Sequence, residues 1–162
     1  MMMALFGMML ASMTASAGAY GAPTASVALN ESGMTLLRGG RGGVIIDGRW
    51  TLGGEGVSSR RAFGEGEGIS YGAFFFERTF LTDGTVHPAV EFSLGGGDIS
   101  QNGVRAAAMV STVGAHLDID VSDWLRLSLG GGYLLTLPDE RLSGSWRVGR
   151  PTLDFMVKFG GF

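Results

Sequence analysis

Cysteine is absent from this 162-residue chain, and histidine occurs only twice, as His87 and His116. Without thiols the chain can form no disulfide, use no thiolate nucleophile and build no cysteine-ligated metal site. The two histidines also lack the spacing of a metal-binding pair. We therefore expect no metal and no cofactor.

Positive charge is also scarce. Lysine and arginine together number 12, against 15 aspartates and glutamates, so the formal net charge is -3. A protein that binds nucleic acid through its surface needs clustered positive charge, because it must neutralise phosphates. We therefore expect no nucleic-acid partner.

Long stretches without glycine are rare as well. Glycine supplies 29 residues, and the longest run that lacks it is 115–129. Glycine in a helix interior costs about 1 kcal/mol relative to alanine, which argues against a helical bundle. A hydrophobic content of 45% argues against disorder. The composition therefore favours an all-β protein.

The first segment has the pattern of a secretory signal. Residues 1–17 read MMMALFGMMLASMTASA, a short apolar run that ends in small residues, and the first charged residue is Glu31. No lysine or arginine precedes the run, so a buried or irregular amino terminus is the alternative. The run is too short for a membrane helix, which needs ~20 apolar residues. We expect a signal peptide at 1–17 and one domain at 18–162.

Turns of alternating length divide the rest of the chain. Asp47-Gly48, the segment 82–85 and Ser122-Asp123 are tight connections, and Asp-Gly is among the strongest hairpin signals. Longer polar stretches lie between them, at 58–68, 98–105 and 138–150. We expect eight strands at 24–30, 33–46, 49–57, 69–81, 86–97, 106–121, 124–137 and 151–162. Several exceed the usual soluble strand of ~5–6 residues, and strands that cross a bilayer need ~9–11.

Side chains alternate along these strands. One face of 124–135 carries leucine and tyrosine, and the other carries Arg126, Ser128 and glycine. The strands at 86–97, 106–121 and 151–162 alternate in the same way. Small residues suit the crowded interior of an eight-stranded barrel, whose lumen is only wide enough for side chains. We therefore expect apolar side chains to face lipid and charged side chains to face inward.

Five segments share a recognisable pattern: RGGRGG (38–43), LGGEG (52–56), LGGG (94–97), LDIDVSDWLRLSLGGGYLL (117–135) and LDFMVKFGGF (153–162). Together they resemble a family of small, porin-like outer-membrane β-barrel proteins. Family members are similar in having an acidic strand, a turn, a tryptophan-led strand and a terminal strand that ends in phenylalanine. Phe162 departs from the pattern, because it is out of phase with Phe155 and Phe159.

The resemblance covers roughly residues 33–162, and it implies both architecture and location. The expected fold is an all-β, eight-stranded, antiparallel, up-and-down transmembrane β-barrel. The expected location is the bacterial outer membrane, with the lipid bilayer as partner and the barrel-assembly machinery as partner during biogenesis. The family does not define a ligand or an activity.

Five inward residues are expected to form a charge network in the lumen. Pairing across the turn at 122–123 brings Asp120 roughly opposite Arg126, with Asp118 one inward pair further along. Glu91 and Glu55 lie on the same face of more distant strands. Paired charges are tolerable in a narrow lumen, whereas isolated ones are costly. Separate screening of each charge by water is the alternative.

Two tryptophans are expected at the membrane interface. Trp50 and Trp124 each open a strand just after a tight turn, and indole rings favour the headgroup region. Bacterial barrels have short periplasmic turns and longer external loops. The tight turns and both termini should therefore face the periplasm.

The sequence leaves one favoured function and three alternatives. We expect a non-enzymatic barrel with a plugged polar lumen, which contributes to envelope structure or presents surface loops. A small pore is the alternative, although porin channels use ~16–18 strands. A lipid-modifying enzyme is another, since His116, Asp118 and Ser128 supply the residue types of a hydrolase triad. An exported soluble lipid-binding barrel is a third.

Overall fold

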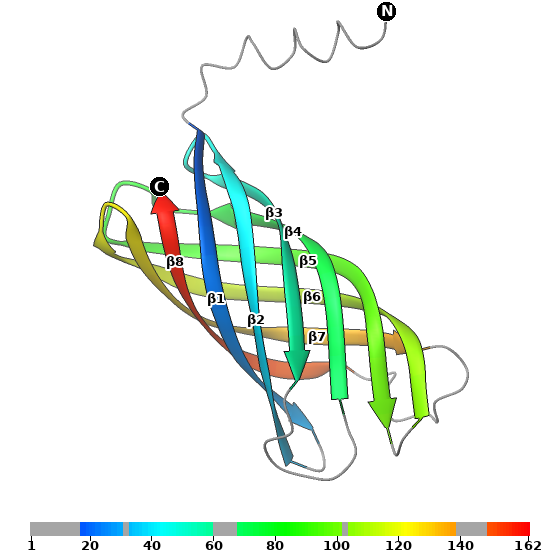
Figure 1. The fold of residues 1–162 in the computed structure, drawn as a ribbon. Helices are drawn as coiled ribbons and strands as arrows, with labels where there is room; N and C mark the ends of the chain where they lie inside the picture. Colours follow the sequence, from blue (N-terminus) through cyan, green and yellow to red (C-terminus); the bar gives the residue numbers. More distant parts are fainter. Residues whose placement is uncertain (1–16, 31–32, 60–67, 102–103, 139–148) are drawn as a thin grey trace, which may run out of the picture.

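The chain folds as a closed antiparallel barrel of eight strands (Figure 1). The computed structural model describes residues 17–30, 33–59, 68–101, 104–138 and 149–162. The strands are β1 (Ala17–Asn30), β2 (Gly33–Ile46), β3 (Trp50–Ser59), β4 (Gly68–Thr79), β5 (Val86–Gln101), β6 (Val104–Ser122), β7 (Leu125–Pro138) and β8 (Arg150–Gly161). Each strand pairs with its neighbour in sequence, and β1 pairs with β8 to close the sheet. No helix of these residues is long and apolar enough to cross a membrane.

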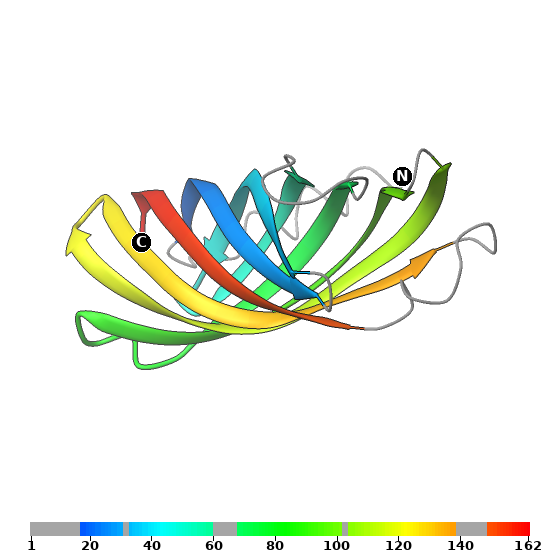
Figure 2. The same cartoon turned by 90° about the horizontal axis from the view of Figure 1, so that it is seen from below.

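The barrel has two distinct ends. The turns at 47–49, 80–85 and 123–124 lie at one end, together with the start of β1 and the end of β8 (Figure 1). We call this the turn end. At the opposite end, the loop end, β1 joins β2 and β5 joins β6, with the pairs Asn30↔Gly33 and Gln101↔Val104. Strands on opposite walls cross at a wide angle, as the tilt of a closed barrel requires (Figure 2).

Strand β1 begins earlier than the sequence indicates. It starts at Ala17 rather than at residue 24, because its alanine and glycine residues pair with β2 along their whole length. Pro23 lies in its middle and pairs with β2, whereas the ladder to β8 is interrupted at residues 22 and 23. Proline has no amide hydrogen to donate, so it is tolerated where one ladder is broken. The expected signal segment lies outside the described residues, apart from Ala17.

One expected loop is in fact strand. The sequence predicts a loop at 98–105, but β5 runs to Gln101 and β6 starts at Val104. Asp98 and Arg105 are therefore strand residues, and both are exposed. The prediction is wrong because polar side chains do not exclude strand. The hairpin carries these two on its outer face, while Ile99 and Ala106 face the apolar cluster inside.

The turn at Asp47-Gly48 has the geometry that its sequence predicts. Both residues have positive φ, 54° and 62°, and the amide of Arg49 donates to the carbonyl of Ile46 at 3.2 Å. Two consecutive positive φ angles define the type I′ turn, whose twist matches that of antiparallel strands. The first ladder pair beyond the turn is Ile46↔Trp50, so Arg49 belongs to the connection.

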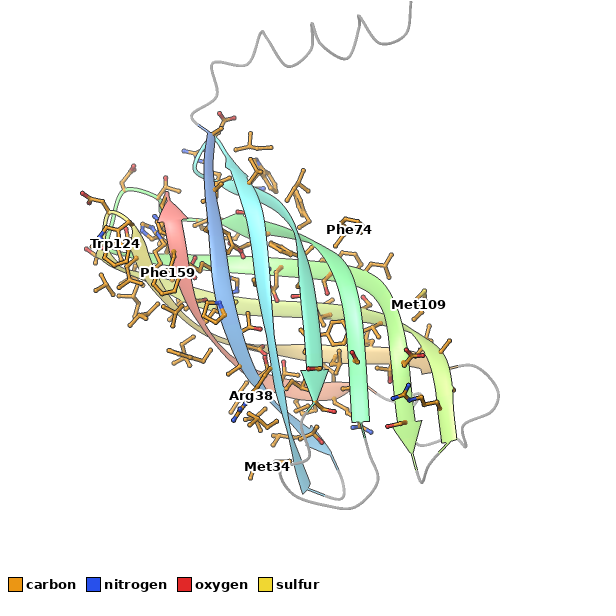
Figure 3. The ribbon with its side chains drawn as sticks, viewed as in Figure 1. Met34, Arg38, Phe74, Met109, Trp124 and Phe159 are labelled. Atoms are coloured by element: carbon orange, nitrogen blue, oxygen red, sulfur yellow. The ribbon has the colours of Figure 1, made fainter. Side chains whose placement is uncertain are left out.

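The outer surface carries the large apolar side chains (Figure 3). Phe74, Met109, Trp124 and Phe159 all point away from the barrel axis, and Phe74 is 83% exposed. The exposed residues of β6 and β7 are those expected from the alternation: Met109, Val113, Leu117, Ile119, Val121, Leu127, Leu129, Tyr133, Leu135 and Leu137. The charged residues buried in the structure lie on the opposite face of the strands. This distribution is the reverse of a soluble barrel.

Candidate functional site: the charged lumen

Two apolar clusters pack against the charged residues of the lumen. Toward the loop end, one cluster contains Ala28, Leu37, Ile69, Tyr71, Ala73, Ile99, Ala106, Ala108, Val110 and Leu134. Toward the turn end, a smaller cluster contains Tyr20, Ala22, Ile45 and Phe75, with Phe162 packed against it. Phe75 fits there because a side chain at Gly53 would overlap its ring. The charged residues lie on the turn side of the first cluster and pack against the second, whose Phe75 ring stacks on Arg41.

Arg41 is the cation of the first half of these charged residues. Its Nη1 donates to Glu91 Oε2 at 2.6 Å and lies 4.0 Å from Glu55 Oε2. Its Nη2 lies 3.7 Å from Glu77 Oε2, and its guanidinium is stacked 3.7 Å from the centroid of the Phe75 ring. Arg41 therefore joins acids from β3, β4 and β5. All four charged side chains are buried or nearly so.

Lys158 is the cation of the second half. Its Nζ donates to Asp118 Oδ2 at 2.8 Å and to both oxygens of Glu77, at 3.1 and 3.4 Å. The same Nζ lies 3.4 Å from Nε2 of His116 and 4.9 Å from the centroid of the Tyr20 ring. Glu77 touches both cations and so links the two halves. We call the set Arg41, Glu55, Glu77, Glu91, His116, Asp118 and Lys158 the lumen network.

A second, smaller cluster closes the turn end. Asp120 pairs with Arg126 Nε and lies 2.8 Å from Nε2 of His87. Nδ1 of His87 donates to the carbonyl of Leu81 at 2.9 Å. Because a carbonyl can only accept, Nε2 can also donate to Asp120 only when the ring is an imidazolium. The guanidinium of Arg126 lies 4.1 Å from the centroid of the Phe162 ring, so the last residue of the chain points inward.

The five residues expected to form one network divide between two clusters. Asp120 is paired with Arg126 at the turn end, as the register Asp120↔Arg126 requires. Asp118 is bonded instead to Lys158, and Glu91 and Glu55 surround Arg41. Sequence reasoning did not assign Arg41, Glu77 or Lys158 to the network. Alternation along each strand places all three inward, but no local pattern says which acids face them across the lumen.

We expect the pair at the turn end to couple measurably. Arg126→Ala should lower the free energy of unfolding by about 2 kcal/mol, between the values for exposed and fully buried pairs. Asp120→Asn should have a similar effect, and the double variant should lose less than the sum. Urea titration of the barrel refolded in vesicles measures all three. Strictly additive losses would mean that water screens the two charges separately.

The lumen network does not form a ready metal site. Ligand atoms of Glu77, Glu91 and His116 lie within 4.8 Å of one another, which is close enough for one ion. However, Lys158 Nζ already lies within 3.4 Å of both Glu77 and His116, and Arg41 is bonded to Glu91. A metal ion would have to displace two cations that these carboxylates already bind.

The residues of the alternative hydrolase triad are not arranged for nucleophilic catalysis. His116 Nε2 lies 3.6 Å from Asp118 Oδ1, but Ser128 Oγ is buried and has no hydrogen-bond partner among the described residues. A serine nucleophile must be hydrogen-bonded to its base. The cavity beside the network holds only about 50 Å³, room for a few water molecules.

The two expected interface tryptophans lie at the turn end on the outer surface. The ring of Trp50 stacks on Phe76 with centroids 5.0 Å apart, and Arg78 lies 4.5 Å from the Trp50 centroid. Trp124 is 59% exposed and stacks on Phe159 with centroids 6.2 Å apart. Both tryptophans thus belong to aromatic pairs between neighbouring strands.

Comparisons with solved structures identify the class of fold. Neisserial surface protein A superimposes with a TM-score of 0.67 at 13% identity, over 91% of this chain and 99% of that protein. Ail, the attachment invasion locus protein of Yersinia pestis, gives 0.55 at 16% identity, over 89% and 97%. Ail in complex with the heparin analogue sucrose octasulfate gives 0.57 at 14% identity, over 91% and 99%.

The chain therefore has the fold of the small eight-stranded outer-membrane barrels. No protein-family model matches the sequence, and no curated protein sequence does. At these identities the likeness establishes the fold, and function has to be argued from the chain itself.

Proposed function

We propose that this protein is an integral outer-membrane barrel that does not conduct and is not an enzyme. On this proposal it contributes to envelope structure or presents its loop end outside the cell. The observation that carries the proposal is the buried lumen network, with one apolar cluster on its loop side and another packed against it at the turn end. A conducting pore would need a continuous aqueous path, and a hydrolase would need an accessible nucleophile. The cavity of about 50 Å³ beside the network, and Ser128 Oγ without a hydrogen-bond partner among the described residues, support the proposal.

The outward face supports the membrane location. It carries exposed phenylalanine, leucine, valine and methionine side chains, while the charged network points inward. A soluble lipid-binding barrel would expose polar residues and keep its apolar face inside, so this distribution argues against that alternative. The insertion of the barrel by the assembly machinery is part of the same proposal.

Two measurements test this function. The protein should fractionate with the outer membrane and migrate faster on unheated than on boiled gels, because the folded barrel is compact. Reconstituted into planar bilayers, it should give no stable conductance, since the lumen network and its apolar neighbours leave no open path. Steady single-channel currents in wild-type protein would overturn the plugged lumen. Solubility without detergent would overturn the membrane location.

Orientation can be tested with single cysteines, since the natural chain has none. We propose that the turn end faces the periplasm, because bacterial barrels have short periplasmic turns. Arg105→Cys at the loop end should react with an impermeant maleimide on whole cells, and Gly84→Cys at the turn end should react only after lysis. Both residues are exposed in the structure. The opposite pattern would reverse the topology.

A further inference from the structure

A groove on the outer surface crosses β5, β6 and β7. It is open along its length and has a volume of about 770 Å³. Its floor is low because Ala115 and Gly131, which are cross-strand partners, carry little or no side chain. The remaining outward side chains along it are Trp50, Phe76, Arg78, Val90, Phe92, Val113 and Tyr133. We call this the oblique groove.

The oblique groove rises from the turn end toward the middle of the barrel. The pairs Arg78↔Val90, Val90↔Ala115 and Ala115↔Gly131 form one row across four strands. Arg78 is the next-to-last residue of β4, whereas Gly131 lies in the middle of β7. A row across tilted strands changes its height in the membrane. A chain lying in the groove would therefore start at the interface and end in the hydrocarbon.

Arg78 supplies a charge at the lower end of the groove. It points outward and is exposed, and its guanidinium lies 4.5 Å from the Trp50 ring centroid and 5.2 Å from that of Phe80. It forms no ion pair with any residue that the structure describes. The other charged residues on the outer face of the strands, Arg38, Asp98 and Arg105, lie at the loop end. The groove thus combines an apolar channel with one uncompensated cation.

We propose that the oblique groove binds one phospholipid with an anionic headgroup, which rests on the proposed outer-membrane location. The phosphate accepts hydrogen bonds from Arg78, whose ring contacts with Trp50 and Phe80 hold the guanidinium at the headgroup level. One acyl chain lies along the row over Ala115 and Gly131, against Phe92, Val113 and Tyr133, which form the next outward row toward the loop end. The charge of Arg78 favours an anionic headgroup, and the space left by the small residues Ala115 and Gly131 accommodates an acyl chain.

Retention of lipid by the folded barrel tests the proposal. The protein is folded in dodecyl maltoside, titrated with dioleoyl phosphatidylglycerol or dioleoyl phosphatidylcholine, and analysed by native mass spectrometry. We expect one retained phosphatidylglycerol per barrel, bound about fivefold more tightly than phosphatidylcholine. Arg78→Gln should remove this preference, whereas Arg49→Gln, in the nearby turn, should retain it. Ala115→Phe should weaken binding of both lipids, and Ala107→Phe, on the same strand but away from the groove, should not.

The outcomes separate this site from the proposed function. Equal retention of the two lipids, unchanged by Arg78→Gln, would overturn the site while leaving the membrane location intact. A lipid-free dimer that Ala115→Phe dissociates would also overturn it, because a second copy would then occupy the groove. Failure of the wild-type barrel to float with vesicles would instead overturn the membrane location itself.

Discussion

Replacing Lys158 by methionine should lower the free energy of unfolding by about 3–5 kcal/mol. The Lys158 side chain is 1% exposed, and its Nζ is the shared donor to Glu77 and Asp118. Methionine has a similar length but no charge, so the variant leaves two carboxylates close together with one cation fewer. Urea titration of the barrel in vesicles, followed by tryptophan fluorescence, measures the loss.

A double variant distinguishes the loss of charge pairing from a loss of packing. Asp118→Asn added to Lys158→Met should recover part of the stability, because it removes one of the unpaired charges. Arg105→Met makes the same kind of change at an exposed position and should alter stability by no more than about 0.5 kcal/mol. A cost below about 1 kcal/mol for Lys158→Met, with no recovery in the double variant, would mean that water rather than Lys158 balances these acids.

Replacing Leu129 by arginine should cost about 2–4 kcal/mol if that position lies near the bilayer midplane. Leu129 is 64% exposed and lies toward the middle of β7 on the outer face. Leu137, on the same face and strand, is 55% exposed but lies one residue from the loop end of β7. Leu137→Arg should therefore cost only about 0–1 kcal/mol, because the penalty falls toward the interface.

The comparison within one strand removes most differences in local structure. Both variants introduce the same side chain on the same face, and only their depth differs. Unfolding in vesicles gives the two free energies directly. Equal, small costs at both positions would show that this face does not contact hydrocarbon. Equal, large costs would indicate disrupted pairing rather than a depth effect.

Much of the fold follows from short-range patterns in the sequence. The alternation in β7, with leucines on one side and Arg126, Ser128 and glycine on the other, predicts a strand and its two faces because side chains alternate with a period of two. Asp47-Gly48 predicts a tight hairpin because aspartate and glycine tolerate positive φ. Eight such strands in up-and-down order are enough to suggest the barrel.

The limits of a strand are harder to predict where the composition of the segment does not indicate a strand. Strand β1 consists largely of small residues, and its membership depends on pairing with β2 and β8 at opposite ends of the chain. The polar end of the β5–β6 hairpin is strand because the two segments pair with each other as far as Gln101↔Val104. The sequence of one segment does not show which other segment pairs with it.

The pairing of charges within the lumen network depends on the closure of the barrel. The sequence places Arg41, Glu77 and Lys158 on inward faces, because that depends only on position along each strand. It cannot pair them, since Arg41 and Glu91 are 50 residues apart and Lys158 and Glu77 are 81 apart. Which inward charges meet depends on strand tilt and register around the whole sheet, which set the height of every side chain. Local alternation thus determines the face of a residue, and only closure determines its partner.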